Sequence, residues 1–166
     1  LGLVEKYGAD ATRFGIAWQI TENQDIRFVE DNILMGRKFC NKLWNASRFV
    51  LMQGGLLTSD FNKLPKSQIL KQLNKTIKSV NKDLENYQFG RAAHILYNFF
   101  WHDFCDKFIE ESKSKNDAET KATLLYVLLT SLKLLHPFIP FITEEIYQKL
   151  PNTKKSLMVE NWPHII

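Results

Sequence analysis

Residues 36–50 contain the side chains whose types and spacing bear most directly on chemistry. Wound as an α-helix at about 100° per residue, this segment divides into two faces. The apolar face consists of Phe39, Cys40, Leu43, Ala46 and Val50. The opposite face is basic and rich in amides, and it consists of Arg37, Lys38, Asn41, Lys42, Asn45 and Arg48, with the rings of Trp44 and Phe49 at its two edges. Because this combination of charge, amides and rings suits single-stranded RNA, we predict an RNA-binding face on this helix.

The side chains of this face would make different kinds of contact with RNA. The four cations would meet phosphates or base edges, and the two asparagine amides present paired donors and acceptors. Trp44 or Phe49 would stack on an unpaired base, a contact worth about 1–3 kcal/mol. The alternative is that both rings complete the edge of the hydrophobic core.

The charge of the chain is concentrated in one stretch. Residues 32–82 contain ten Lys and Arg residues against one acid, Asp60, which gives this stretch +9 and leaves −5 for the rest of a chain whose net charge is +4. Clustered cations of this kind neutralise phosphates and release counterions, so the stretch indicates a polyanion-binding surface. The alternative is that these lysines only solvate exposed helix faces. Lys71, Lys75, Lys78 and Lys82 form a separate outward stripe on the next helix, and the basic face of residues 36–50 is expected to continue into this stripe.

Residues with catalytic potential are poorly placed for catalysis. His102 and Asp106 are four residues apart on one helix face, but no third residue has the spacing of a metal ligand, so we expect a surface pair. Glu144 and Glu145 are adjacent and point in different directions on a helix. The sequence contains no glycine-rich phosphate loop, no nucleophile motif and no Cys/His cluster. We therefore expect no catalytic site, no metal and no cofactor in this chain.

The elements that position these side chains are predicted to be helices. With 45% hydrophobic and 24% charged residues, seven Gly and five Pro, the 166-residue chain fits one all-α domain built as a bundle of about five helices. A short N-terminal helical segment spans residues 4–18, and residues 25–28 alternate like a brief extended segment. The bundle helices are predicted at about residues 30–52, 66–87, 89–114, 118–136 and 140–150, with Gly54-Gly55 ending the first. An extended tail, residues 156–163, is expected to fold back on the bundle through Leu157, Val159 and Trp162.

Targeting signals are missing from the sequence. No apolar run reaches the roughly 18 residues of a membrane span, and the first residues do not resemble a signal peptide. We therefore expect a soluble cytoplasmic protein in which Cys40 and Cys105 are reduced core residues. The lack of an initiator methionine leads us to expect a piece of a longer protein.

Five motifs, in order and spacing, resemble valyl-tRNA synthetases, a branch of the class I aminoacyl-tRNA synthetases. They cover the whole chain: residues 7–14 (YGADATRF), 24–28 (QDIRF), 36–50, 136–146 (HPFIPFITEEI) and 156–160 (SLMVE) followed by Trp162-Pro163. The first and fourth are shared with isoleucyl and leucyl relatives, whereas residues 39–46 (FCNKLWNA) point to the valyl branch. The chain has Asn23-Gln24 where relatives commonly have Gly-Arg, which affects that turn only.

The resemblance implies a division of the chain and a role for it. Residues 1–28 would be the connector that follows the catalytic core, and residues 29–166 the anticodon-binding helical bundle. The parent enzyme would use ATP and magnesium to charge tRNA-Val with valine, while this chain, which lacks the catalytic and editing sites, would be inactive alone. Its partners would be tRNA-Val and the catalytic core of the same polypeptide, in a monomer.

Three alternatives stay open at this point. The bundle could serve mainly as a rigid spacer and docking body, with tRNA contacts supplied elsewhere. It could be the same domain of an isoleucyl or leucyl relative. An unrelated helical nucleic-acid-binding protein would require the order of the motifs to be accidental.

Overall fold

The computed structural model describes residues 2–20, 28–54, 67–115, 117–151 and 155–165, and these are helical with no strand among them. The helices are α1 (Gly2–Tyr7), α2 (Ala9–Gln19), α3 (Glu30–Met52), α4 (Gln68–Glu85), α5 (Phe89–Asn98), η2 (Phe99–Ile109), α6 (Glu110–Ser112), α7 (Ala118–Leu135), α8 (Pro140–Tyr147) and the short 3₁₀ helix η3 (Leu157–Val159). This arrangement confirms the predicted all-α bundle. Two sequence predictions lie partly outside the described residues: the extended segment at residues 25–28, of which only residue 28 is described, and the glycine pair, of which only Gly54 is described.

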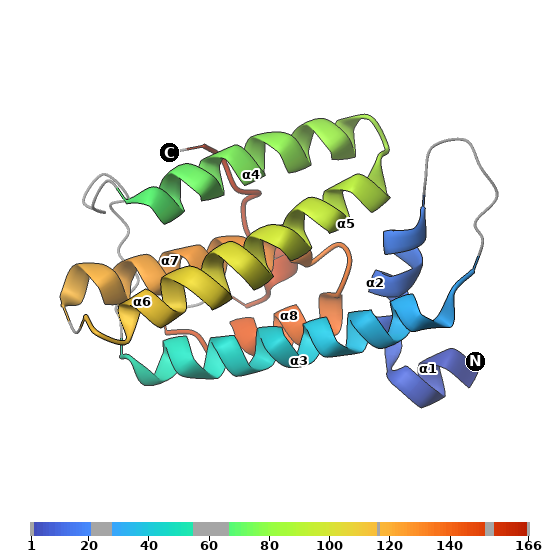
Figure 1. Cartoon of the computed structure of the whole chain (residues 1–166), viewed down its shortest axis with the longest axis horizontal. Helices are drawn as coiled ribbons and strands as arrows, with labels where there is room; N and C mark the ends of the chain where they lie inside the picture. The colour runs from blue at the N-terminus through green and yellow to red at the C-terminus, as the bar shows by residue number, and fades with distance from the viewer. Residues whose placement is uncertain (1, 21–27, 55–66, 116, 152–154, 166) are drawn as a thin grey trace.

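The long helices run roughly side by side. In Figure 1, α3 lies along the lower edge of the bundle and α4 along the upper edge, with the continuous helix α5–η2–α6 and α7 between them. α1 and α2 are at the end of the bundle where α3 begins. Each long helix turns an apolar stripe inward, and the core includes Phe14, Leu43, Ile77, Phe104 and Leu128, all completely buried.

The N-terminal segment is two helices rather than the one predicted over residues 4–18. Gly8 separates them, and its φ of +91° belongs to a region of backbone space that residues with a Cβ rarely enter. The break lets α2 turn and enter the same core as the bundle, where Phe14 stacks on Phe39 with ring centroids 4.8 Å apart. The division of the chain at residue 28 stays a prediction.

Helix α3 has the predicted bounds, and its apolar side is buried. Where α2 crosses α3, the backbones come so close that a Cβ on Gly36 would lie 2.6 Å from the carbonyl oxygen of Ala11. Only glycine fits at this position without displacing backbone. The crossing fixes the rotation of α3 about its own axis, and so determines which of its side chains face solvent.

The predicted helix at residues 89–114 is continuous, but its middle part, η2, has the i→i+5 hydrogen bonds of a π-helix. The buried side chains follow the same five-residue step, since Phe99, Phe104 and Ile109 form one row and Phe100 and Cys105 a second. In the sequence the apolar residues of this segment recur at steps of both four and five, so their spacing does not distinguish a π-helix from an α-helix. Read as an ordinary α-helix, the segment gives the correct element and the wrong local register.

The C-terminal tail folds back on the bundle, as predicted, but through a different set of residues. Leu157 is buried, and the Trp162 indole Nε1–H donates to Asn81 Oδ1 on α4 at 2.8 Å. Val159 is 65% exposed, so its predicted docking role is wrong. Carboxylates supply the remaining anchors: Glu144 accepts hydrogen bonds from Ser156 and from the Leu157 N–H, and Glu160 pairs with Lys133. Burial acts to raise the pKa of Glu144, but hydrogen bonds from Gln148, Ser156 and the Leu157 N–H outweigh it and hold that pKa below its usual value.

Two polar side chains of α2 clamp the segment that leads into α8. Asp10 accepts hydrogen bonds from the backbone N–H groups of Phe141 and Ile142, at 3.2 and 2.6 Å, and so caps the N-terminus of α8 from another helix. The guanidinium of Arg13 donates to the carbonyl oxygens of Pro137 and Phe138, at 2.9 and 3.2 Å. The motifs at residues 7–14 and 136–146 are therefore two halves of one structural joint.

We expect the substitution Asp10→Ala to lower the free energy of unfolding by about 1–2 kcal/mol, the usual cost of losing a helix cap. Asp10→Asn keeps one acceptor oxygen and should cost less. Urea unfolding measures both changes, and amide hydrogen exchange at residues 141 and 142 should accelerate in the alanine variant. Equal stability of the alanine variant and the unsubstituted chain would contradict the capping role.

Candidate nucleic-acid interface

The outward side of α3 presents a row of polar side chains without partners among the residues that the structure describes. Arg37, Lys38, Asn41, Asn45 and Arg48 are all exposed, and none forms an ion pair or a side-chain hydrogen bond with another described residue. The row follows successive turns and spans about 16 Å at 1.5 Å per residue. Three cations and two amides are thus available to an external ligand. We call these five residues the α3 face.

Lys42 does not share this face, because it is held by the neighbouring helix. Its Nζ lies 2.8 Å from Asp106 Oδ1 on η2 and 5.2 Å from the centre of the Trp101 ring. The hydrogen bond to Asp106 raises the pKa of Lys42, and the same contact lowers the pKa of Asp106. A lysine already neutralised by a carboxylate has little charge to offer a phosphate.

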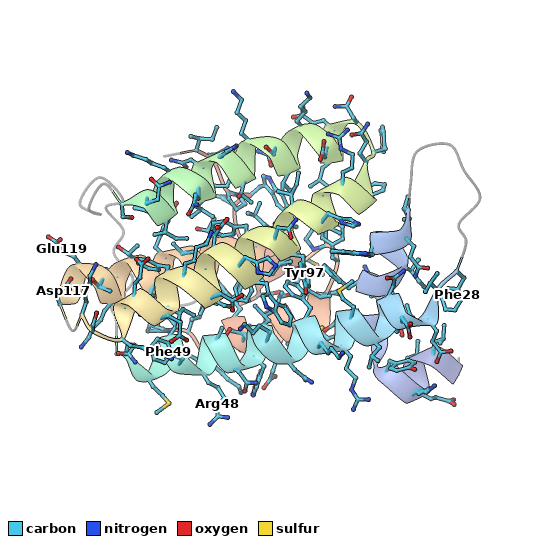
Figure 2. The ribbon with its side chains drawn as sticks, viewed as in Figure 1. Phe28, Arg48, Phe49, Tyr97, Asp117 and Glu119 are labelled. Atoms are coloured by element: carbon cyan, nitrogen blue, oxygen red, sulfur yellow. The ribbon has the colours of Figure 1, made fainter. Side chains whose placement is uncertain are left out.

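The two rings at the edges of the helix both pack against the core. Phe49 is half-buried and lies on the side of α3 that faces the bundle, whereas Arg48 points away from it (Figure 2). Trp44 is also half-buried, and the ammonium of Lys149, in the turn that follows α8, lies 5.8 Å from its ring centre. This favours the interpretation that both rings complete the edge of the core, and Lys149 itself is paired with Glu145 at 2.7 Å. No sequence pattern could have paired residues 44 and 149, since the contact depends on how α8 packs on α3.

A hollow of about 310 Å³ opens beside the N-terminal half of the α3 face. Arg37 and Asn41 line one side, and Tyr7, Asp10 and Phe141 line the other. Phe141 is 66% exposed, which leaves its ring available at the rim. A cation, an amide and an aromatic ring therefore meet at one depression, although sequence reasoning did not include residue 141 in the site.

The second basic stripe lies on a different side of the molecule. Lys71, Lys75, Lys78 and Lys82 are all exposed on α4, opposite its buried residues Leu73, Ile77 and Val80. Because α3 and α4 occupy opposite edges of the bundle (Figure 1), the stripe does not extend the α3 face. A single surface made of both helices would have required them to be neighbours.

The candidates for catalysis and metal binding have structural partners. His102 Nδ1 and Asp106 Oδ2 are 3.2 Å apart, which confirms the surface pair. Burial raises the pKa values of Cys40 and Cys105 to about 12, so both are protonated thiols, and neither is in a disulfide. Within the described ranges, no group of three or more His, Cys, Asp or Glu side chains could hold a metal ion.

None of the helices described has both the length and the apolar character needed to cross a membrane.

The helical bundle and its basic faces are typical of an RNA-binding helical domain. Comparison with known proteins identifies the family. Residues 66–165 match the family model described as the anticodon-binding domain of tRNA ligase. The chain therefore belongs to the anticodon-binding domain family of tRNA ligases.

Similar proteins with a known activity include several bacterial valine–tRNA ligases. The chain is 43% identical to a valine–tRNA ligase of Thermotoga maritima and 42% identical to those of Bacillus cereus and Geobacillus stearothermophilus. Each alignment covers 99% of this chain but only 20% of the relative, so the chain spans about a fifth of the length of these enzymes. Its fold is also similar to part of a leucyl-tRNA synthetase from Agrobacterium radiobacter, solved in a ternary complex with tRNA and LeuAMS. That match has a TM-score of 0.71 at 21% identity and covers 99% of this chain and 20% of the other.

Proposed function

We propose that this chain is the tRNA-binding part of a valine–tRNA ligase and that its α3 face binds the anticodon stem-loop of tRNA-Val. The observation that carries the proposal is the row of three cations and two amides, all exposed and without partners among the described residues. Arg37, Lys38 and Arg48 would meet phosphates, while Asn41 and Asn45 would reach base edges. The hollow between Arg37 and Phe141 has room for an unpaired base.

The remaining steps of the reaction belong, in this proposal, to other parts of the polypeptide. Valine activation and transfer would need ATP and magnesium in a catalytic core attached to this chain, and the chain alone would be inactive. The whole enzyme would act as a cytoplasmic monomer. Identity of 40–43% to valine–tRNA ligases supports the valyl assignment over a leucyl or isoleucyl one. The likeness to a leucyl enzyme, at 21% identity, is weaker support for either of these alternatives.

A docking role is the second candidate function. A mainly apolar groove of about 410 Å³ lies at the α2 end of the bundle, and its lining includes Ile16, Leu84, Phe89 and Phe138. Ile16 and Phe89 are 41% and 39% exposed, which favours contact with another surface of the polypeptide. Failure of the chain to bind RNA would leave this docking role as its function.

The single substitution Arg48→Ala should weaken binding of the tRNA-Val anticodon stem-loop about fivefold at 0.1 M salt. Losing one phosphate contact removes about 0.7–0.9 from the slope of log K against log salt, which corresponds to this factor. Fluorescence anisotropy over a salt series measures both quantities. Lys115→Ala, an exposed lysine in the turn before α7, is the control and should change neither. Unchanged affinity and slope for Arg48→Ala would remove this residue from the interface.

A further inference from the structure

The lysine stripe of α4 (Lys71, Lys75, Lys78 and Lys82) has the geometry of a binding surface in its own right. The four residues follow steps of four, three and four along one side of α4, so their ammonium groups form a line about 16 Å long. The buried residues of the same helix lie on the other side and hold it against the bundle. The stripe is therefore fixed in direction and faces away from the molecule.

The charges of the stripe are not neutralised, unlike those of many lysines in this chain. Six lysines elsewhere have a carboxylate oxygen at 2.7–2.8 Å: Lys6, Lys42, Lys107, Lys113, Lys133 and Lys149. No described carboxylate lies within 4.0 Å of any of the four stripe lysines. Four like charges on successive turns destabilise a helix slightly. This pattern is better explained by an external polyanion than by solvation alone.

A groove lined by both polar and apolar side chains lies beside the stripe and adds hydrogen-bonding groups to its charge. Its volume is about 320 Å³, and its lining includes Gln72, Lys75, Ser79, Asn98 and Asp103. The carboxylate of Asp103 is already paired with Lys107 at 2.8 Å, so it does not present a free negative charge to a phosphate. Amide and hydroxyl groups next to cations are suited to ribose hydroxyls and base edges next to a phosphodiester backbone.

We propose that the α4 stripe and the groove beside it form a second RNA-binding surface, independent of the α3 face. The helices that carry the two surfaces, α3 and α4, lie at opposite edges of the bundle, so a stem-loop bound along α3 is separated from α4 by the helices between them (Figure 1). The ligand is the phosphodiester backbone of RNA, either another part of the same tRNA or a second RNA molecule. The inference does not depend on valine specificity or on the residues assigned to the α3 face.

The test uses the chain with all four stripe lysines replaced by glutamine, and the anticodon stem-loop as the probe. At about 50 mM salt, calorimetry should give two stem-loops bound per unsubstituted chain and one per stripe variant. The control replaces Lys113, Lys115, Lys121 and Lys155 by glutamine, which removes the same net charge elsewhere. This control should still bind two. Circular dichroism checks that the stripe variant keeps the helix content of the unsubstituted chain.

Whole tRNA distinguishes the two sources of the backbone. If one tRNA spans both surfaces, the complex is 1:1 and the slope of log K against log salt falls in magnitude by about 3 in the stripe variant. If a second RNA binds, two tRNAs bind per chain and one is lost. The proposal is overturned if the stripe variant and the control bind RNA alike, or if the stripe variant loses only binding to polyglutamate or anionic lipid vesicles. Neither result would affect the α3 face, which is tested by substitutions on α3 alone.

Discussion

Replacing Arg37, Lys38 and Arg48 together by glutamine is expected to weaken binding of the anticodon stem-loop about 100- to 500-fold at 0.1 M salt. Each cation that contacts a phosphate contributes a factor of about 5–8 through counterion release, and the three factors multiply. A 100-fold loss corresponds to about 2.7 kcal/mol of binding free energy. The slope of log K against log salt should fall in magnitude by about 2–3, which a salt series measured by fluorescence anisotropy would show.

Folding should be unaffected by this triple substitution. All three side chains are exposed and have no ion-pair partner among the described residues, so the free energy of unfolding in urea should change by less than about 0.5 kcal/mol per site. The matched control is the chain with Lys107, Lys113 and Lys121 replaced by glutamine, which loses the same net charge away from α3. If both variants lose the same affinity, net charge rather than the α3 face binds the RNA, and the proposed function fails.

The α3 face could be predicted because it depends on one helix alone. The amphipathic pattern over residues 36–50 predicts the side of α3 that faces solvent. Five of the six polar positions predicted to be outward are exposed, namely Arg37, Lys38, Asn41, Asn45 and Arg48. A single-helix pattern cannot identify partners on other helices. Lys42 belongs to the polar side of the pattern but lies next to η2, where Asp106 neutralises it.

Other features could not be predicted because they depend on how the helices are assembled. The lysine stripe of α4 was correctly identified as an exposed row, but its position opposite α3 follows from bundle packing. Tail docking was predicted through Leu157, Val159 and Trp162, each an apolar residue. The structure uses only two of them and adds the carboxylates of Glu144 and Glu160, which a search for apolar anchors does not consider. Polar anchors of this kind are visible only once their partners are in place.

The substitution Glu160→Ala is expected to lower the free energy of unfolding by about 3 kcal/mol. Glu160 Oε2 lies 2.8 Å from Lys133 Nζ, and the side chains are only 13% and 17% exposed. Its other oxygen accepts a hydrogen bond from the hydroxyl of Tyr147, a residue that is 1% exposed. Removing the carboxylate leaves a largely buried ammonium uncompensated, which costs about 3–5 kcal/mol. The lower end applies here because some water reaches the pair.

Comparing this buried ion pair with an exposed one separates the effect of burial on stability from the effect of charge pairing. Glu145 pairs with Lys149 at 2.7 Å, but these side chains are 59% and 47% exposed, so Glu145→Ala should cost less than about 0.5 kcal/mol in the same urea titration. In the background Lys133→Met, Glu160→Ala should cost much less than in the unsubstituted chain, because no buried charge is then left alone. Equal costs in the two backgrounds would mean that Glu160 holds the tail through contacts other than Lys133. The ion pair would then not be what fastens residues 156–163 to α7 and α8.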